Sequence, residues 1–201
     1  MNSLLPAGRY FFKHKGYPLS EEESLKDLAE VILRQKNRKV PESLQEACDK
    51  DSSKLFEVFL SSKGKNYNTS YVRKLKVSLV PIIAKIKEYY DRPRPQEAAQ
   101  KMGIKISFDD LSSAKSPSYP SGHTIQAYVV ALYLLEQFPE LEEELLKIAE
   151  MISQSRIDRG VHFPTDIDYG REVAYDLYDQ IREGLGGETP QYKLVYDENY
   201  Y

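Results

Sequence analysis

The apolar residues between positions 72 and 86 recur at intervals of three and four, the spacing that places them on one face of an α-helix. Helical spacing returns along most of the chain, and no segment shows the alternation of apolar and polar residues that marks a half-buried strand. We therefore predict an all-α fold, a helical bundle. Helices are expected to begin after a Ser20–Glu23 capping box and at Pro41, to include residues 55–59, and to cover about 70–90, 122–138, 139–155 and 164–184.

Two stretches between these helices are predicted to be irregular. Residues 96–120 collect serines and prolines toward their end, a composition typical of a loop, and residues 157–163 are expected to form a turn. A chain of 201 residues suits one domain, which we place at residues 1–187, with the helices of 1–50 included. The polar, tyrosine-rich residues 188–201 are expected to form a flexible tail.

Charge and composition exclude several classes of partner. The formal net charge of −3 provides no overall basic field for nucleic acid. No segment approaches the roughly 20 apolar residues that span a bilayer, so membrane insertion is not expected. Residues 1–20 contain no apolar run typical of a signal peptide. The chain as written is therefore expected in the cytoplasm, or in the periplasm if a signal peptide has been removed.

A first group of basic residues lies at the end of the predicted 70–90 helix and just beyond it. Lys87 is followed after six residues by Arg94, which stands between Pro93 and Pro95. The prolines would hold the guanidinium in a fixed direction, where its planar fork can grip two phosphate oxygens while Lys87 supplies a point charge. Taken alone, the group is better explained as a basic helix end that complements the helix dipole.

A second group, Pro120-Ser121-Gly122-His123, stands where the predicted loop meets the next helix. A helix N-terminus offers free N–H groups and a partial positive charge, and therefore binds anions. Gly122 would let the backbone come close to a ligand, the Ser121 hydroxyl would add a hydrogen bond, and His123 could act as a general acid. A serine N-cap beside an incidental histidine explains the same residues equally well.

A third group contains Ser155-Arg156, His162 and Asp166. Asp166 follows His162 by four residues, at the start of the last predicted helix. A carboxylate at this position can accept a hydrogen bond from Nδ1–H of His162, which fixes the tautomer and leaves Nε2 nucleophilic. Arg156 adds a third cation. The alternative is an aspartate that only favours the helix N-terminus.

Together the three groups specify eleven positions in a fixed order, which chance does not explain. They resemble the three signature motifs of the type 2 phosphatidic acid phosphatase (PAP2) superfamily, which includes bacterial class A non-specific acid phosphatases, membrane lipid phosphatases and vanadium haloperoxidases. The resemblance is closest to the soluble class A enzymes and covers about residues 50–180. Two departures concern Gln96, where class A enzymes usually carry Phe, and the sequence 162–166, which is nearer the lipid phosphatases.

The resemblance implies a metal-independent phosphatase that hydrolyses phosphate monoesters through a phosphohistidine intermediate. His162 would attack phosphorus, Asp166 would orient it, and His123 would protonate the leaving group. The phosphate would be held by Lys87, Arg94, Ser121, Gly122 and Arg156. The three cations are expected to lower the pKa of both histidines, while Asp166 raises that of His162.

No cofactor and no metal are expected, and the sequence contains no group of histidines and carboxylates with ligand spacing. The expected partner is a small phosphorylated substrate, with vanadate as an inhibitor or analogue in the same pocket, and class A relatives suggest a homo-oligomer. Two alternatives stay open. A vanadate-dependent haloperoxidase would bind vanadate at His162, although those enzymes are much longer. A phosphate-binding module without catalysis would be expected to lose His123 or His162, and both are present.

Overall fold

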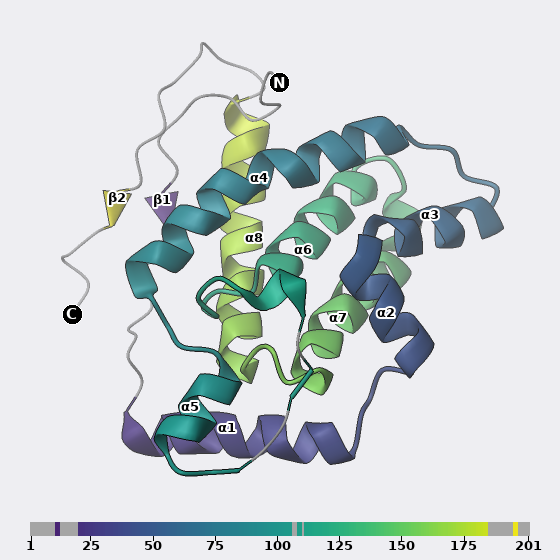
Figure 1. Cartoon of the computed structure of the whole chain (residues 1–201). Helices are drawn as coiled ribbons and strands as arrows, with labels where there is room; N and C mark the ends of the chain where they lie inside the picture. Colours follow the sequence, from purple (N-terminus) through teal and green to yellow (C-terminus); the bar gives the residue numbers. More distant parts are fainter. Residues whose placement is uncertain (1–10, 13–19, 106–107, 110, 185–194, 197–201) are drawn as a thin grey trace.

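The computed structural model describes residues 11–12, 20–105, 108–109, 111–184 and 195–196, and it confirms the all-α prediction (Figure 1). Two-residue strands, which the sequence pattern did not indicate, pair in parallel as β1 (Phe11–Phe12) and β2 (Val195–Tyr196). The helical elements are α1 (Glu21–Lys36), α2 (Glu42–Asp51), α3 (Ser53–Ser62), α4 (Thr69–Tyr90), α5 (Pro95–Lys101), η1 (Ser112–Ala114), α6 (Gly122–Leu135), η2 (Pro139–Leu141), α7 (Glu142–Asp158) and α8 (Pro164–Gly184).

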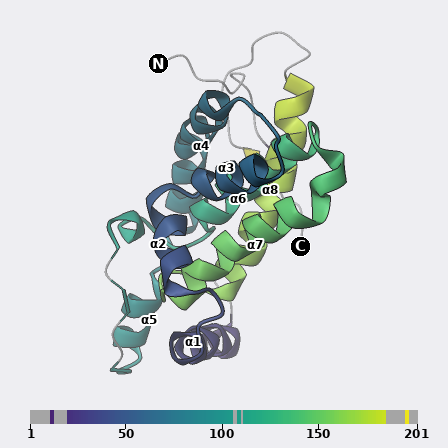
Figure 2. The same ribbon diagram turned by 90° about the vertical axis from the view of Figure 1, so that its right-hand side faces the viewer.

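The centre of the bundle is α6, which packs along α7 and α8 and is crossed by α4 on another side (Figures 1 and 2). At one end of the bundle α1 contacts α5, α7 and α8, while α2 and α3 lie against α7. The end of α4 and the starts of α6 and α8 meet as a consequence of this arrangement.

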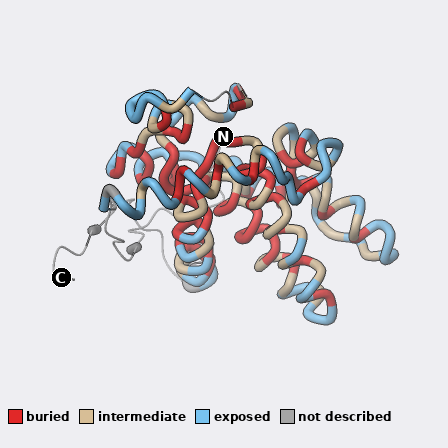
Figure 3. The backbone as a smooth tube through the Cα atoms, turned by 90° about the horizontal axis from the view of Figure 1, so that it is seen from below, coloured by how far each residue is buried: buried red, intermediate tan, exposed pale blue. Residues whose placement is uncertain are grey.

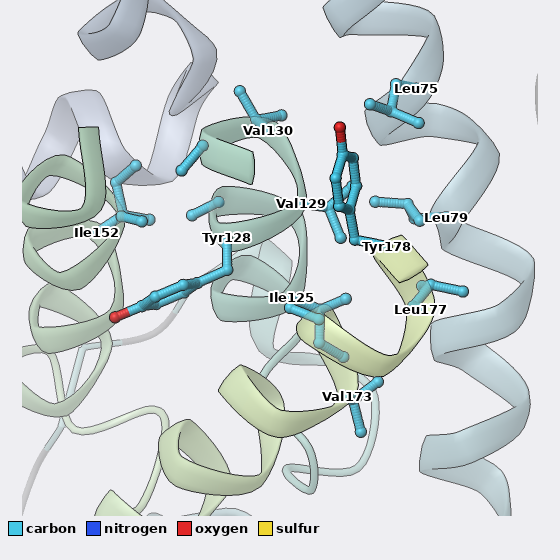
Figure 4. Packing of buried hydrophobic residues seen from close by; sticks show 14 of the residues in the cluster. Leu75, Leu79, Ile125, Tyr128, Val129, Val130, Ile152, Val173, Leu177 and Tyr178 are labelled. Atoms are coloured by element: carbon cyan, nitrogen blue, oxygen red, sulfur yellow. The ribbon is translucent and has the colours of Figure 1, made fainter. Parts of the chain in front are cut away.

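The core forms around α6 because this helix is apolar on almost every side, and such a helix must be covered all round. Figure 4 shows Tyr178 of α8 between Val129 of α6 and Leu79 of α4, while Tyr128 points to the side of α7. The buried stretches of the backbone accordingly gather in the middle of the bundle (Figure 3).

The helix ends follow local rules that the sequence carries. The predicted capping box forms, with the N–H of Glu23 3.2 Å from Ser20 Oγ and the N–H of Ser20 2.9 Å from Glu23 Oε2. The side chain of Asn68 caps α4. At the other end of α4, Asp91 adopts a left-handed backbone conformation (φ 45°) and turns the chain into the segment that carries Arg94.

The predicted loop 96–120 and turn 157–163 are both shorter than expected. Pro95 starts α5, because its fixed φ suits the first helical position, and η1 interrupts the rest of the loop. α7 continues to Asp158, so the turn covers only 159–163. The helix predicted at 122–138 ends at Leu135, and the one predicted at 139–155 begins with the 3₁₀ turn η2. Most of the predicted tail, 188–201, lies outside the described residues.

A buried ion pair fixes α1 to the end of α7. Arg34 Nε donates to Asp158 Oδ1 at 2.7 Å, and the N–H groups of Lys39 and Val40 donate to Oδ2 at 2.9 and 2.7 Å. The Asp158 side chain is fully buried, so these donors are what make its charge tolerable. The pair also holds the last turn of α7, which carries Arg156.

Replacing Asp158 with Asn should therefore destabilise the protein by about 3–5 kcal/mol, because Arg34 would be left buried without its counter-charge. Urea unfolding measures the change. The matched control is Glu22→Gln, which breaks the exposed pair with Lys26 and should cost less than about 1 kcal/mol. Equal effects of the two substitutions would show that the buried pair does not stabilise the fold.

Candidate active site

The structure brings the three groups of residues together at one end of the bundle. Helix ends and the segments next to them supply every member, so the backbone of the bundle fixes their positions. They come from the end of α4 and the segment after it (Lys87, Arg94), the start of α6 (Ser121, Gly122, His123), the end of α7 (Arg156), and the start of α8 with the turn before it (His162, Asp166).

His162 is held in one tautomer by its two neighbours. The residue is 2% exposed, Nδ1 lies 2.9 Å from Asp166 Oδ2, and Nε2 lies 3.0 Å from Nη1 of Arg94. An arginine only donates and an ionised carboxylate only accepts. The proton of the neutral ring therefore sits on Nδ1, and the lone pair sits on Nε2.

The Asp166 carboxylate is oriented by further donors that sequence reasoning missed. The N–H of Phe163 donates to Oδ2 at 2.9 Å, and Arg92 Nη1 donates to Oδ1 at 2.7 Å. Arg92 in turn donates to Asp27 of α1 at 2.7 Å, and its guanidinium lies over the Phe163 ring, 3.9 Å from the centroid. The charged side chains of Asp27, Arg92 and Asp166 thus connect α1 to His162.

The starts of α6 and α8 touch each other directly. The N–H of Ser121 donates to the backbone oxygen of Asp166 at 2.9 Å. A Cβ on Gly170 would lie 3.1 Å from the backbone oxygen of Ser121 and 3.2 Å from Thr124 Cβ, so the two helices approach too closely for a side chain without displacing these atoms. Two helix N-termini, each a favourable place for an anion, therefore meet at the same point.

The cations Lys87 and Arg94 are buried in the site. Lys87 Nζ donates to the Ser118 oxygen at 3.3 Å, while Arg94 donates to the Ser116 oxygen through Nε at 2.8 Å and to the Val161 oxygen through Nη1 at 2.6 Å. These acceptors are neutral carbonyls. Burial, followed by repulsion from Arg94, lowers the pKa of Lys87 to about 7, and burial is also the main reason that the pKa of Arg94 falls to about 10. An anion would reverse both shifts.

Arg156 is fully buried and is held by two residues that the sequence did not single out. Nη1 donates to Asp49 of α2 at 2.8 Å, and Nη2 donates to Ser113 Oγ of η1 at 3.0 Å. Its Nε is buried and has no hydrogen-bond partner among the described residues. A buried donor without an acceptor is costly, so this guanidinium is suited to receive an oxygen of a ligand.

The environment lowers the pKa of both histidines. Burial is the largest cause for each; Arg156 is the next cause for His123, and Arg94 followed by Lys87 for His162. Asp49 opposes the shift at His123. The direction at His162 agrees with the effect expected of the cations, and Asp166 does not reverse it.

A pocket of about 650 Å³ opens beside this cluster, between α4 and the start of α6. One wall is the face of α4 from Val80 to Glu88, which includes Lys87, together with Asp91 just after the helix. The other walls are Ser116 and Pro117 and the first two turns of α6, including Gly122 and His123. His162 is not among the residues that line the pocket.

Two findings concern metals and membranes. Within the described ranges, no three histidine, cysteine, aspartate or glutamate residues are placed to hold a metal ion. In the same part of the chain, no helix is long and apolar enough to cross a membrane.

Buried cations and two helix N-termini around a histidine whose Nε2 carries the lone pair are the features of an anion-binding site. Residues 75–175, about half of the chain, match the PAP2 superfamily, and the chain belongs to this superfamily. The matched segment contains every predicted site residue.

Curated relatives are similar over a shorter segment. The chain is 38% identical over 90 residues to a non-specific acid phosphatase of Salmonella typhimurium, which is 45% of this chain and 36% of the relative. The chain is 39% identical over 88 residues to a non-specific acid phosphatase of Providencia stuartii, and this segment covers 44% of the chain and 35% of the relative. It is 33% identical over 92 residues to an acid phosphatase of Zymomonas mobilis, and this segment covers 46% of the chain and 34% of the relative. The matches thus span about a third of each relative.

Two solved structures share the fold. A transmembrane PAP2-type phosphatidylglycerolphosphate phosphatase from Bacillus subtilis superposes with a TM-score of 0.54 at 21% identity, covering 82% of this chain and 86% of its own. A bacterial vanadium-dependent iodoperoxidase superposes with a TM-score of 0.57 at 17% identity, covering 94% of this chain and 54% of its own.

The pKa of Lys87 gives the site a measurable proton linkage. At pH 8 most of the free protein carries neutral Lys87, and a bound phosphate favours the ammonium form, so binding should take up as much as about 0.9 proton. Calorimetric titration with inorganic phosphate in two buffers of different ionisation enthalpy measures this uptake. Lys87→Met should abolish it, whereas the exposed neighbour variant Lys85→Met should keep it. Undiminished uptake in Lys87→Met would assign the proton to another group.

Proposed function

We propose that this protein is a metal-independent phosphatase that hydrolyses phosphate monoesters through a phosphohistidine intermediate. The observation that carries the proposal is the environment of His162, with Nδ1 on Asp166 and Nε2 directed at Arg94 among buried cations. A neutral imidazole of fixed tautomer is a nucleophile, and the cations favour an anionic substrate. The names of the curated relatives support the same activity.

In the first step, the Nε2 lone pair of His162 attacks phosphorus in line with the leaving oxygen. The N–P bond forms, the P–O bond breaks, and His123 donates a proton to the departing oxygen, so the product leaves as an alcohol. Asp166 remains ionised and stabilises the positive charge that develops on the imidazole. The remaining phosphate oxygens are held by Lys87, Arg94, Arg156, the Ser121 hydroxyl and the Gly122 N–H.

In the second step, water attacks the phosphorus of the phosphohistidine. His123, now neutral, accepts a proton from the water, the N–P bond breaks, and inorganic phosphate is released. Nε2 of His162 recovers its lone pair, and His123 is protonated for the next cycle. No metal and no cofactor take part in either step.

Substrate binding has to redirect one hydrogen bond of Arg94. Nη1 of Arg94 lies 3.0 Å from Nε2 of His162, on the lone pair that the attack requires. A phosphate oxygen is a stronger acceptor for a guanidinium than a neutral imidazole is. The phosphate therefore attracts this donor and exposes Nε2, while the hydrogen bond from Nε to the Ser116 oxygen keeps the rest of the guanidinium in place.

The decisive experiment is hydrolysis of p-nitrophenyl phosphate between pH 4 and 8 in excess EDTA. The wild type should turn over, and His162→Ala should lose at least about a thousandfold in kcat because it lacks the nucleophile. Thermal unfolding checks that the variant is folded. The lowered pKa values of both histidines place the expected optimum below pH 7.

Other outcomes of this experiment would contradict the proposal. Turnover that EDTA abolishes would require a metal. An inert wild type that oxidises bromide or iodide after addition of vanadate would be a haloperoxidase. An inert wild type that only binds phosphate would be a binding module.

Asp49 should raise the pH at which activity is lost on the alkaline side, because it acts on the pKa of His123. Its carboxylate opposes the lowering of the pKa of His123, so Asp49→Asn should move the alkaline limb of kcat/KM to lower pH. The matched control on the same helix is Glu46→Gln, whose exposed partner is Lys50. A uniform loss at every pH, with the limb unmoved, would limit Asp49 to holding Arg156 in place.

A further inference from the structure

The pocket beside the site has a polarity that changes along α4. The residues of α4 that line it recur at intervals of three and four, so they share one face of the helix, and Asp91 lines it just beyond the end of α4. Val80, Ile83 and Ala84 form an apolar end, Lys87 lies in the middle, and Glu88 and Asp91 form an acidic end. At 1.5 Å per residue, the apolar end lies about 5–10 Å from Lys87 along the axis and Glu88 about 1.5 Å, while Asp91 directly follows the last residue of the helix.

The two ends of the pocket differ in the packing and charge of their side chains. Val80 is 51% exposed, so its side chain lies largely outside the protein's own packing. Ile83 is buried beside Gly122, where a Cβ would lie 3.2 Å from its Cγ2. Glu88 and Asp91 are exposed. An apolar group in the pocket would cover Val80, whereas an anionic group would meet two carboxylates.

In-line displacement fixes where the alcohol part of a substrate lies. The leaving oxygen is opposite Nε2 of His162 and within reach of His123. His123, Gly122 and Lys87 line the pocket and His162 does not, so the pocket is on the leaving-group side of the phosphate. This step rests on the proposed function.

We infer that this pocket receives the alcohol part of the substrate and selects monoesters of apolar alcohols without a second negative charge. Val80, Ile83 and Ala84 bind the apolar chain. Glu88 and Asp91 disfavour phosphorylated acids and diphosphates. All five residues are therefore specificity determinants.

Linear alkyl phosphates test the apolar end, because their leaving groups differ in length and hardly in chemistry. We expect kcat/KM for hexyl phosphate to exceed that for ethyl phosphate by about tenfold or more in the wild type. Val80→Asp should reduce this ratio to less than about threefold. The control is Val77→Asp, an exposed valine one turn away that does not line the pocket, and it should keep the wild-type ratio.

Two three-carbon substrates test the acidic end. We expect the wild type to prefer glycerol 3-phosphate to 3-phosphoglycerate by about tenfold, and the double variant Glu88→Gln/Asp91→Asn to reduce that preference several-fold. Asparagine tolerates the left-handed conformation at position 91, so the backbone can be kept. Glu143→Gln, an exposed glutamate of α7, is the matched control and should leave the preference unchanged.

The outcomes separate the inference from the proposed function. Hydrolysis of all these esters with equal kcat/KM, or equal ratios in Val80→Asp and Val77→Asp, would overturn the inference and leave the phosphatase in place. An unchanged preference in the double variant would overturn the role of the carboxylates. A wild type that hydrolyses none of the esters would overturn both the inference and the proposed function.

Discussion

The buried carboxylate of Asp166 is the group on which the rest of the site depends. A fully buried charge is tolerated only when donors surround it, and Asp166 receives them from His162, Phe163 and Arg92. Arg92 is shared with Asp27 of α1, so one guanidinium stands between two carboxylates. The direction of Nε2 therefore depends jointly on α1, on the turn after α4 and on the start of α8, and no single element of the bundle determines it.

Much of the fold could be predicted from local sequence signals. The three–four spacing of α4, the Ser20 cap and the proline at the start of α8 each act within a few residues, and they gave the helices almost completely. The seven residues of α5 are too few to show a period, and its stability comes from packing against α1. The pairing of β1 with β2 joins distant parts of the chain, which no local pattern reveals.

The candidate site was likewise predictable only where its residues lie close together in the sequence. The residues in contiguous motifs could be found because spacing alone places a histidine and an aspartate on one helix start. Asp49 was missed because its partner Arg156 is 107 residues away. Asp27 did carry a signal: it lies four residues before Val31, on the buried face of α1, where an aspartate requires a partner. Its partner Arg92 could be identified only from the packing of α1 against the rest of the bundle.

The hydrogen bond between Ser121 and Asp166, with Gly170 packed against the same turn, joins the start of α8 and the N-terminus of α6 into one mechanical unit. Arg94 is tied to this unit as well, because it donates to the Val161 oxygen and lies 3.0 Å from Nε2 of His162. Lys87 lies across the pocket on α4, and the pocket runs along the seam between α4 and the start of α6. Under the proposed function, a product alcohol can therefore leave along this seam while the hydrogen bonds that orient Nε2 stay in place.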